Sequence, residues 1–203
     1  PFNGNANDES GNGNDGDVNG ATPAKDKFGN DASAYKLSNN KYIELPPINN
    51  VSGSSERTFS FWTKYENNYN GKLIAYGADS PRRTFGINVN VNKWYFWSSY
   101  DDFNVDPNVN VDKIWRMHTV TYGSGTVKYY IDGKPKESKK ISLNTQNGPI
   151  YIGDGLPWDP SSSYYQGLID NLRIYDRPLD QAEVTALYEL ENTPTPSLER
   201  GLI

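Results

Sequence analysis

The stretch GLIDNLRIYDRPLDQAEVTALYEL, residues 167–190, changes its apolar period halfway along and thereby decides the fold class. Its first half suits a two-residue period, which predicts a β-strand whose successive side chains point to opposite faces. One face of this strand would carry Leu168, Asp170, Leu172 and Ile174. Proline cannot donate to a sheet hydrogen bond, so the strand is expected to end before Pro178. An acidic residue therefore stands on an apolar strand face near the end of the chain.

The second half of the same stretch has the period of a helix. Asp180 precedes Glu183 by three residues, which places an acceptor and an acid where a helix N-terminus favours them. An apolar stripe follows at helical spacing and consists of Val184, Leu187 and Tyr188. The spacing predicts one short helix over residues 180–190, with one face packed on the rest of the domain.

Composition excludes several classes of protein. The chain has 203 residues, of which 35% are hydrophobic and 13% are aromatic, with 18 Gly and 13 Pro. This length is enough for a sizeable core, and the turn-forming residues suit many short strands. The net charge of −5 argues against nucleic-acid binding. No apolar run approaches the length of a membrane-spanning helix, and the absence of cysteine excludes disulfides and thiolate metal sites.

Ten segments have the composition and length of strands, with turn signals between them. They are Ala34–Leu37, Tyr42–Leu45, Thr58–Glu66, Lys72–Ala78, Thr84–Asn90, Lys93–Ser99, Trp115–Tyr122, Thr126–Ile131, Pro149–Ile152 and Leu168–Tyr175. The lysine-rich run at residues 134–140 is expected to form a solvent-exposed edge strand. This pattern predicts one all-β domain over residues 1–190, a sandwich of two antiparallel sheets, followed by a linker or tail at residues 191–203.

Six segments occur in an order that resembles one family. They are FNGNANDESGNGNDGDVNG (2–20), DKFGNDASAYKLSNNKYIELP (26–46), TFSFWTKYE (58–66), IWRMHTVTYGSGTVKYYIDGK (114–134), YIGDG (151–155) and GLIDNLRIYDRPLDQAEVTALYE (167–189). Over about residues 2–190 the chain resembles the bacterial laminin G-like domains of the concanavalin A-like lectin/glucanase superfamily. The resemblance implies a jelly-roll sandwich whose first and last strands pair, with one bound calcium ion. It also implies an extracellular module, attached to a secreted enzyme or a surface adhesin.

An enzyme is the alternative to be weighed, because the same fold includes glucanases and polysaccharide lyases. Retaining glucanases need two carboxylates about 5–5.5 Å apart, and in this superfamily they come from one acid-rich strand. No predicted strand carries such a cluster, and the nearest acids, Glu189 and Glu191, stand at the end of the helix. The only histidine, His118, is expected to be a packed residue. We therefore predict a non-catalytic domain, with a glycoside hydrolase or lyase as the less favoured alternative.

Aromatic side chains are the candidate ligand-binding residues, because the apolar faces of sugar rings stack on them. Alternation divides the run NKWYFWSSYDDF (92–103) between two faces, with Trp94 and Phe96 on one and Tyr95 and Trp97 on the other. A second aromatic group lies in the Pro- and Ser-rich run at residues 156–167. The predicted ligand-binding residues are Trp97, Trp158, Tyr95, Tyr100, Tyr164 and Tyr165. The alternative for each group is that it plugs the sandwich without contacting a ligand.

These residues predict a calcium-stabilised, lectin-like module that binds a glycan weakly and works as a monomeric unit of a larger secreted or surface protein. Neither a nucleic-acid partner nor membrane insertion is expected. The alternative function is a protein-interaction or spacer domain of a surface adhesin. The lectin hypothesis requires an exposed aromatic pair beside polar side chains, on the concave sheet or at one end of the sandwich. If every tryptophan is buried and no groove exists, the spacer hypothesis is favoured.

The N-terminal segment and the last strand are predicted to share one structural calcium ion. Calcium takes six to eight oxygen ligands at about 2.3–2.6 Å. The predicted ligands are Asn5, Asn7, Asp8, the backbone at Gly29 and Asn30, and Asp170. A buried carboxylate at position 170 is costly unless a cation accompanies it. The family resemblance, and not the spacing, places these segments side by side. The alternative is that the N-terminal residues form Asx-turns and that Asp170 pairs with a lysine or a backbone N–H.

Overall fold

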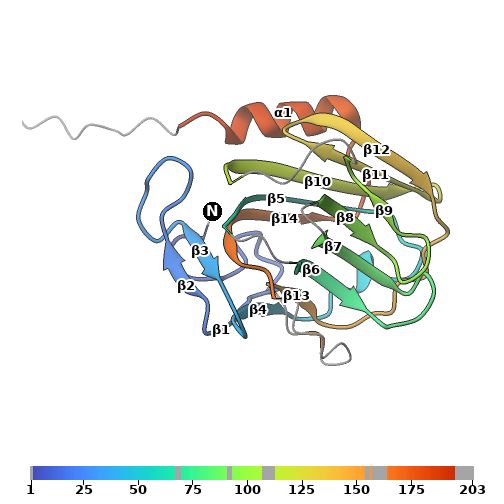
Figure 1. Cartoon of the computed structure of the whole chain (residues 1–203), viewed down its shortest axis with the longest axis horizontal. Helices are drawn as coiled ribbons and strands as arrows, with labels where there is room; N and C mark the ends of the chain where they lie inside the picture. The colour runs from blue at the N-terminus through green and yellow to red at the C-terminus, as the bar shows by residue number, and fades with distance from the viewer. Residues whose placement is uncertain are drawn as a thin grey trace, which may run out of the picture.

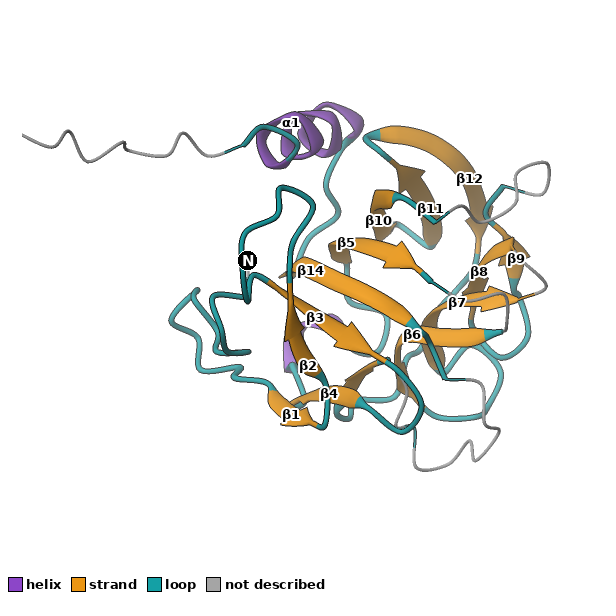
Figure 2. Ribbon diagram, turned by 60° about the vertical axis from the view of Figure 1, so that its left-hand side comes forward, coloured by secondary structure: helices purple, strands orange, loops and turns teal. Residues whose placement is uncertain are grey.

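The computed structural model describes residues 2–66, 70–90, 93–106, 113–153, 156 and 164–194. In it the chain forms two antiparallel sheets of seven strands each, which pack on one another with one helix beside them (Figures 1 and 2). The predicted two-sheet, all-β sandwich with one short helix is therefore confirmed.

Each sheet mixes strands from distant parts of the sequence. The first sheet contains, in spatial order, β1 (Asp17–Asn19), β4 (Tyr42–Leu45), β13 (Ile150–Ile152), β6 (Gly71–Gly77), β7 (Thr84–Asn90), β8 (Lys93–Trp97) and β9 (Phe103–Asn104). The second sheet contains β12 (Lys134–Lys140), β11 (Thr126–Ile131), β10 (Trp115–Gly123), β5 (Arg57–Tyr65), β14 (Gly167–Tyr175), β3 (Ala34–Leu37) and β2 (Thr22–Ala24). A short 3₁₀ helix, η1 (Asn49–Val51), follows β4.

The ten strands predicted by composition are all present, with ends that differ by one or two residues. The lysine-rich β12 lies at the edge of the second sheet, where its charged side chains discourage pairing with another chain, as predicted. The sequence analysis missed β1, β2 and β9, which have only two or three residues each. Segments this short contain too few side chains to show a period.

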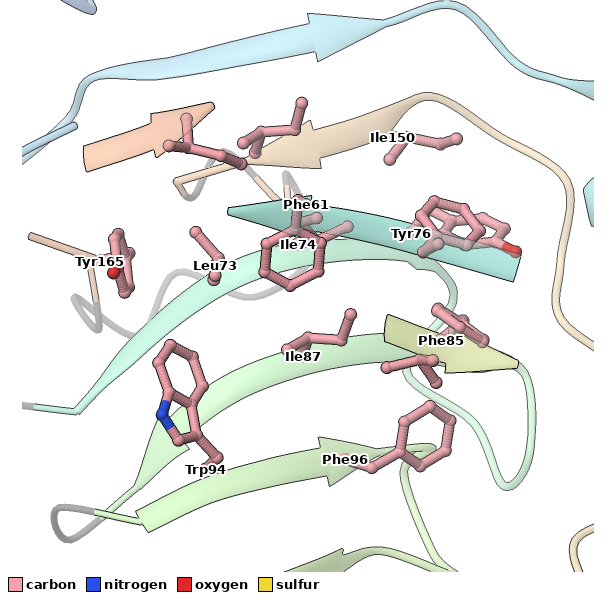
Figure 3. Packing of buried hydrophobic residues seen from close by; sticks show 14 of the residues in the cluster. Phe61, Leu73, Ile74, Tyr76, Phe85, Ile87, Trp94, Phe96, Ile150 and Tyr165 are labelled. Carbon is pink, nitrogen blue, oxygen red and sulfur yellow. The ribbon is translucent and has the colours of Figure 1, made fainter. Parts of the chain in front are cut away.

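The main core fills the space between the sheets, and its centre is aromatic (Figure 3). Alternation along β8 sends Trp94 and Phe96 inward, where both are buried. The ring of Phe96 meets that of Phe85 edge to face, with centroids 5.2 Å apart. Tyr95 and Trp97 consequently point to the outer face of the first sheet. The predicted division of this aromatic run between two faces is confirmed.

Helix α1 (Gln181–Glu191) packs on the outer face of the second sheet over β5, β10 and β11 (Figure 1). A capping box starts it, in which Asp180 accepts the Glu183 N–H and Glu183 accepts the Asp180 N–H. Its apolar stripe packs on a second cluster of buried residues, namely Trp62, Met117, Tyr130, Leu179 and Val184. Tyr188 stacks on Trp62 with ring centroids 5.7 Å apart. Among the described residues, no helix has the length and apolar content that a membrane crossing requires.

A β-bulge in β14 overturns one prediction about its faces. The pairing with β5 shifts between Asp170 and Arg173, and Asn171 has a positive φ of 50°. Leu172 and Ile174 therefore pack against the main core, whereas Asp170 faces the opposite side as the cross-strand partner of Trp62. The prediction that Asp170 shares a face with Leu172 and Ile174 is wrong, because the inserted residue reverses the alternation.

Candidate functional site

The outer face of the first sheet carries a row of residues that crosses five strands. The row consists of Glu44, Tyr151, Ala75, Gly86 and Trp97, each directly opposite the next on the neighbouring strand. Directly opposite residues share a face, so these side chains lie away from the core. From Trp97 to Tyr151 the row spans three strand spacings, which is about 14 Å. Two aromatic side chains therefore stand apart on one face, with only small residues between them.

The indole of Trp97 lies against the backbone of Gly86. A Cβ atom built on Gly86 would come within 2.9 Å of Trp97 Cε3, closer than side chains approach one another. Because glycine has no side chain, the Trp97 indole can pack directly against the backbone of the neighbouring strand. Trp97 is partly exposed, and its height above the strands is set by this contact. The sheet positions the ring as a rigid platform.

Polar groups lie beside the aromatic row. Asn88 of β7 stands opposite Tyr95 of β8, and Tyr95 stands opposite Asn104 of β9. The Tyr95 hydroxyl donates to Asp102 Oδ2 at 3.3 Å, and burial together with Asp102 raises the pKa of Tyr95. Asn88 Oδ1 is buried and has no hydrogen-bond partner within the described part of the chain. The face therefore carries polar side chains next to an aromatic ring.

A second aromatic pair stands at the far end of the row. The rings of Tyr42 and Tyr151 lie 6.0 Å apart between centroids and are both partly exposed. Burial, and then the nearby Glu44 and Tyr42, raise the pKa of Tyr151. This end of the face thus combines two phenol groups with one carboxylate, which can accept hydrogen bonds from hydroxyl groups.

The predicted ligand-binding residues do not all reach this face. Trp97 and Tyr95 lie on it, as described above. Tyr100 follows β8 in a turn and is 78% exposed, and Tyr164 is partly exposed beside β6. Tyr165 is a core residue, fully buried, with its hydroxyl bonded to Thr63 (Figure 3). Trp158 lies outside the described residues.

The sequence analysis missed Tyr42, Glu44, Asn88 and Tyr151. Alternation in the runs Tyr42–Leu45 and Ile150–Ile152 places the tyrosines on the face away from the core-facing isoleucines. The orientation of these tyrosines could therefore have been predicted from the sequence. What the sequence did not show was the strand order, which brings β13 and β4 into the same sheet as β8.

A groove of about 910 Å³ separates the N-terminal loop from the last strand. Asn7, Asp8 and Asn171 of β14 are among the residues that line it. Hydrogen bonds from Ser10 and Asn14 hold the Asp8 carboxylate and lower its pKa to about 2. The groove brings two of the predicted calcium ligands next to the neighbour of Asp170.

The other predicted calcium ligands are engaged in local hydrogen bonds. Asn5 Oδ1 accepts the Asn7 N–H at 2.9 Å in an Asx-turn. The Gly29 carbonyl accepts from Lys25 Nζ at 3.4 Å, and the Asn30 side chain donates to Asp26. In the described ranges, no group of three or more His, Asp or Glu side chains is placed to hold a metal ion. A calcium site here would therefore depend on amide and carbonyl oxygens as well as carboxylates.

Asp170 is the predicted ligand with the most unusual environment. The side chain is buried, at 2% exposure, and its Oδ1 accepts the Asn171 N–H at 2.6 Å. Burial raises its pKa to about 6, and the Asn171 hydrogen bond and the charge of Lys27 oppose this rise. Asn171 Oδ1 is also buried and has no partner in the described part of the chain. A carboxylate and an unused carbonyl oxygen are therefore adjacent in the sequence and poorly solvated.

His118 is packed, as predicted. The imidazole is fully buried, and its Nδ1 lies 3.0 Å from the Tyr129 hydroxyl. Burial lowers its pKa to about 3, so it stays neutral and enclosed at physiological pH. A group without access to solvent cannot exchange protons with a substrate, so His118 offers no support for acid–base catalysis.

Comparison with known protein families places most of the chain in one of them. The family model described as concanavalin A-like lectin/glucanases superfamily, a laminin G type, matches residues 37–185. Among curated proteins, the adhesion G-protein coupled receptor V1 of Danio rerio is 22% identical over 152 residues. That match covers 68% of this chain and 2% of the receptor, so the chain corresponds to one small part of it.

Solved structures show the same fold. Domain 4 of AbnA, a GH43 extracellular arabinanase from Geobacillus stearothermophilus, in complex with arabinotriose, has a TM-score of 0.70 and 25% identity, covering 92% of this chain and 94% of that domain. The binding domain of botulinum neurotoxin serotype D in complex with N-acetylneuraminic acid has a TM-score of 0.71 and 18% identity. This match covers 91% of this chain and 48% of the toxin domain.

Proposed function

Because the chain belongs to the concanavalin A-like lectin/glucanases superfamily, we propose that it is a non-catalytic module that binds a carbohydrate on the outer face of its first sheet. One observation carries this proposal. The face combines partly exposed Trp97, Tyr95 and Tyr151 with the partly exposed carboxylate side chain of Glu44. Helix α1 packs on the outer face of the second sheet, so the side chains that a ligand could contact differ between the two outer faces.

Binding would combine ring stacking with hydrogen bonds. The apolar face of a sugar ring packs on an aromatic side chain, and such contacts contribute about 0.5–1.5 kcal/mol each beyond the area they bury. Hydroxyl groups would donate to the carboxylates of Glu44 and Asp102. A few contacts of this size correspond to dissociation constants from micromolar to millimolar. Because the row is about 14 Å long, an oligosaccharide would reach both aromatic ends where a single sugar would not.

The comparisons support carbohydrate as the ligand class. The arabinanase domain resembles this chain over nearly its whole length, and its structure holds arabinotriose. Arabinotriose is a neutral oligosaccharide, which suits a face whose carboxylates would repel an acidic sugar. The toxin domain is 18% identical in sequence to this chain, so its similarity supports the fold alone.

The proposal includes a structural calcium ion beside Asp170. The buried carboxylate of Asp170 and the unpaired Asn171 Oδ1 fit a cation that prefers oxygen ligands. Asn7 and Asp8, which line the same groove as Asn171, would supply further oxygens. When bound, the ion would neutralise the buried charge and join the N-terminal loop to the last strand. The measurement is a melting curve in millimolar calcium and in EDTA, and chelation should lower Tm. An unchanged Tm would contradict the proposed ion.

We also propose an extracellular or cell-surface location, within a larger protein. Laminin G-like domains typically work outside the cell, and the match to an adhesion receptor agrees with this. The same match favours a second candidate function, a protein-interaction or spacer domain in a surface protein. The two functions differ in whether purified domain binds a glycan.

A glycan array with the wild-type domain and the Trp97→Ala variant tests the proposed function. Wild type should retain neutral oligosaccharides, and the variant should lose them while keeping its melting temperature. Tyr100→Ala is the matched control, because Tyr100 is 78% exposed and follows the same strand without lying in the aromatic row. If the Trp97→Ala variant still binds the glycans, or if only the Tyr100→Ala variant loses them, the binding site lies elsewhere. No retained glycan in any arm would favour the spacer function.

A further inference from the structure

The carboxylate of Asp170 has an incomplete set of partners. It is 2% exposed and accepts one backbone N–H, from Asn171. Among the described residues, no side-chain cation lies within ion-pair distance of it. A buried carboxylate with one hydrogen bond needs a compensating positive charge to stay ionised. The surrounding loops therefore have to supply that charge.

Lys27 is a lysine on these loops whose charge acts on Asp170, and its ammonium group is also incompletely satisfied. Lys27 Nζ lies 3.4 Å from the centroid of the Trp62 ring. It is buried and has no hydrogen-bond acceptor in the described part of the chain. Trp62 is the cross-strand partner of Asp170, so Lys27 and Asp170 are both neighbours of this tryptophan. Burial lowers the pKa of Lys27, and the charges of Glu191, Asp170 and Asp26 oppose this.

The other two carboxylates near Lys27 already have partners. Glu191 accepts from Arg173 Nε at 2.5 Å and from Trp62 Nε1 at 2.7 Å. Asp26 accepts two backbone N–H groups and the side-chain amide of Asn30 within its own loop. Asp170 is consequently the acid in this cluster whose charge is least compensated.

We infer that Lys27 is the resident counter-charge of Asp170 and that it competes with calcium for this carboxylate. The inference rests on the calcium site proposed above and assigns Lys27 the role of setting its affinity. With the metal absent, the ammonium stabilises the buried charge across the face of Trp62. With the metal present, the ammonium and the ion repel each other, because two positive charges a few ångströms apart in a poorly solvated site interact strongly. The domain would therefore fold without calcium and bind it only weakly.

The Lys27→Met variant tests this inference, because methionine keeps most of the apolar stem over Trp62 and removes the charge. Calcium binding is measured by titration calorimetry, and Tm is measured in EDTA. The variant should melt several degrees below wild type in EDTA and bind calcium about tenfold more tightly. Lys36→Met is the control, because Lys36 lies in the same sheet as Asp170 and its ammonium group pairs with the exposed Glu66. It should match wild type in both measurements.

A double-mutant cycle separates the role of Lys27 from the existence of the calcium site. Wild type, Lys27→Met, Asp170→Asn and the double variant are compared in EDTA. If Asp170→Asn removes the stability loss caused by Lys27→Met, the counter-charge is supported even if no variant binds calcium. Additive losses would overturn the counter-charge. Equal calcium affinity in wild type and Lys27→Met, or no calcium binding by either, would overturn the competition.

Discussion

Replacing His118 with leucine is expected to make the fold less sensitive to acid. The imidazole is fully buried between the rings of Phe61 and Trp94. Its Nδ1 lies 3.0 Å from the Tyr129 hydroxyl, and its Nε2 has no partner within the described residues. Burial, followed by the charge of Arg116, lowers its pKa from 6.5 to about 3. The folded protein therefore keeps His118 neutral at pH values at which the unfolded chain protonates it.

The size of this effect follows from proton linkage. Between the two pKa values, 6.5 and about 3, the unfolded chain binds more protons, so the free energy of unfolding falls as the pH is lowered. Each pH unit is worth about 1.4 kcal/mol, so His118 costs the fold roughly 3 kcal/mol at about pH 4. Asp170 acts in the opposite direction, because burial raises its pKa from 3.8 to about 6 and the folded protein then binds the extra proton. Comparison of wild type with the variant cancels the contribution of Asp170.

The assay is urea unfolding of wild type and His118→Leu at about pH 7 and about pH 4, in EDTA. The variant loses the hydrogen bond to Tyr129, so at neutral pH it should be about 1 kcal/mol less stable than wild type. At about pH 4 the order should reverse, because only wild type carries the cost of the histidine. A stability difference that is the same at both pH values would refute the neutral, buried imidazole.

Three further substitutions test local features of the fold. Asp180→Ala removes the capping box of α1 and should cost about 1 kcal/mol in urea unfolding. Gly86→Ala places a Cβ against the indole of Trp97, so it should weaken glycan binding in a calorimetric titration by more than it lowers Tm. Glu191→Gln weakens one buried and one partly buried hydrogen bond at the end of the helix and should cost about 1.5–3 kcal/mol, with an earlier loss of helix signal on heating.

Much of the fold was predictable because local patterns determine the strands and the helix. Period-two alternation located the longer strands, and the Asp180 cap with its apolar stripe located α1. The bulge at Asn171 was not predictable from the pattern, because one inserted residue changes no composition. That single residue reversed the predicted face of Asp170. Asp170 is nevertheless buried, beneath loops on the helix side of its sheet.

The candidate site was only partly predictable. Alternation separated Trp97 from the core-facing Trp94, since the two belong to one strand. Tyr151 and Glu44 join Trp97 only through the order of strands in the sheet, and pairings between distant segments leave no local signal. Tyr165 was misassigned to a ligand surface because its neighbours have loop composition, although the side chain points into the core.

The most direct test of the account is the indole N–H resonance of Trp97 in the ¹⁵N-labelled domain during titration with arabinotriose or another neutral oligosaccharide. The Trp97→Phe variant assigns that resonance. If the sugar binds on the outer face of the first sheet, the Trp97 signal should shift and saturate, while the signals of the buried Trp62 and Trp94 move little. Binding that leaves the Trp97 signal in place, or no shift for any neutral oligosaccharide at millimolar concentration, would contradict the proposed function.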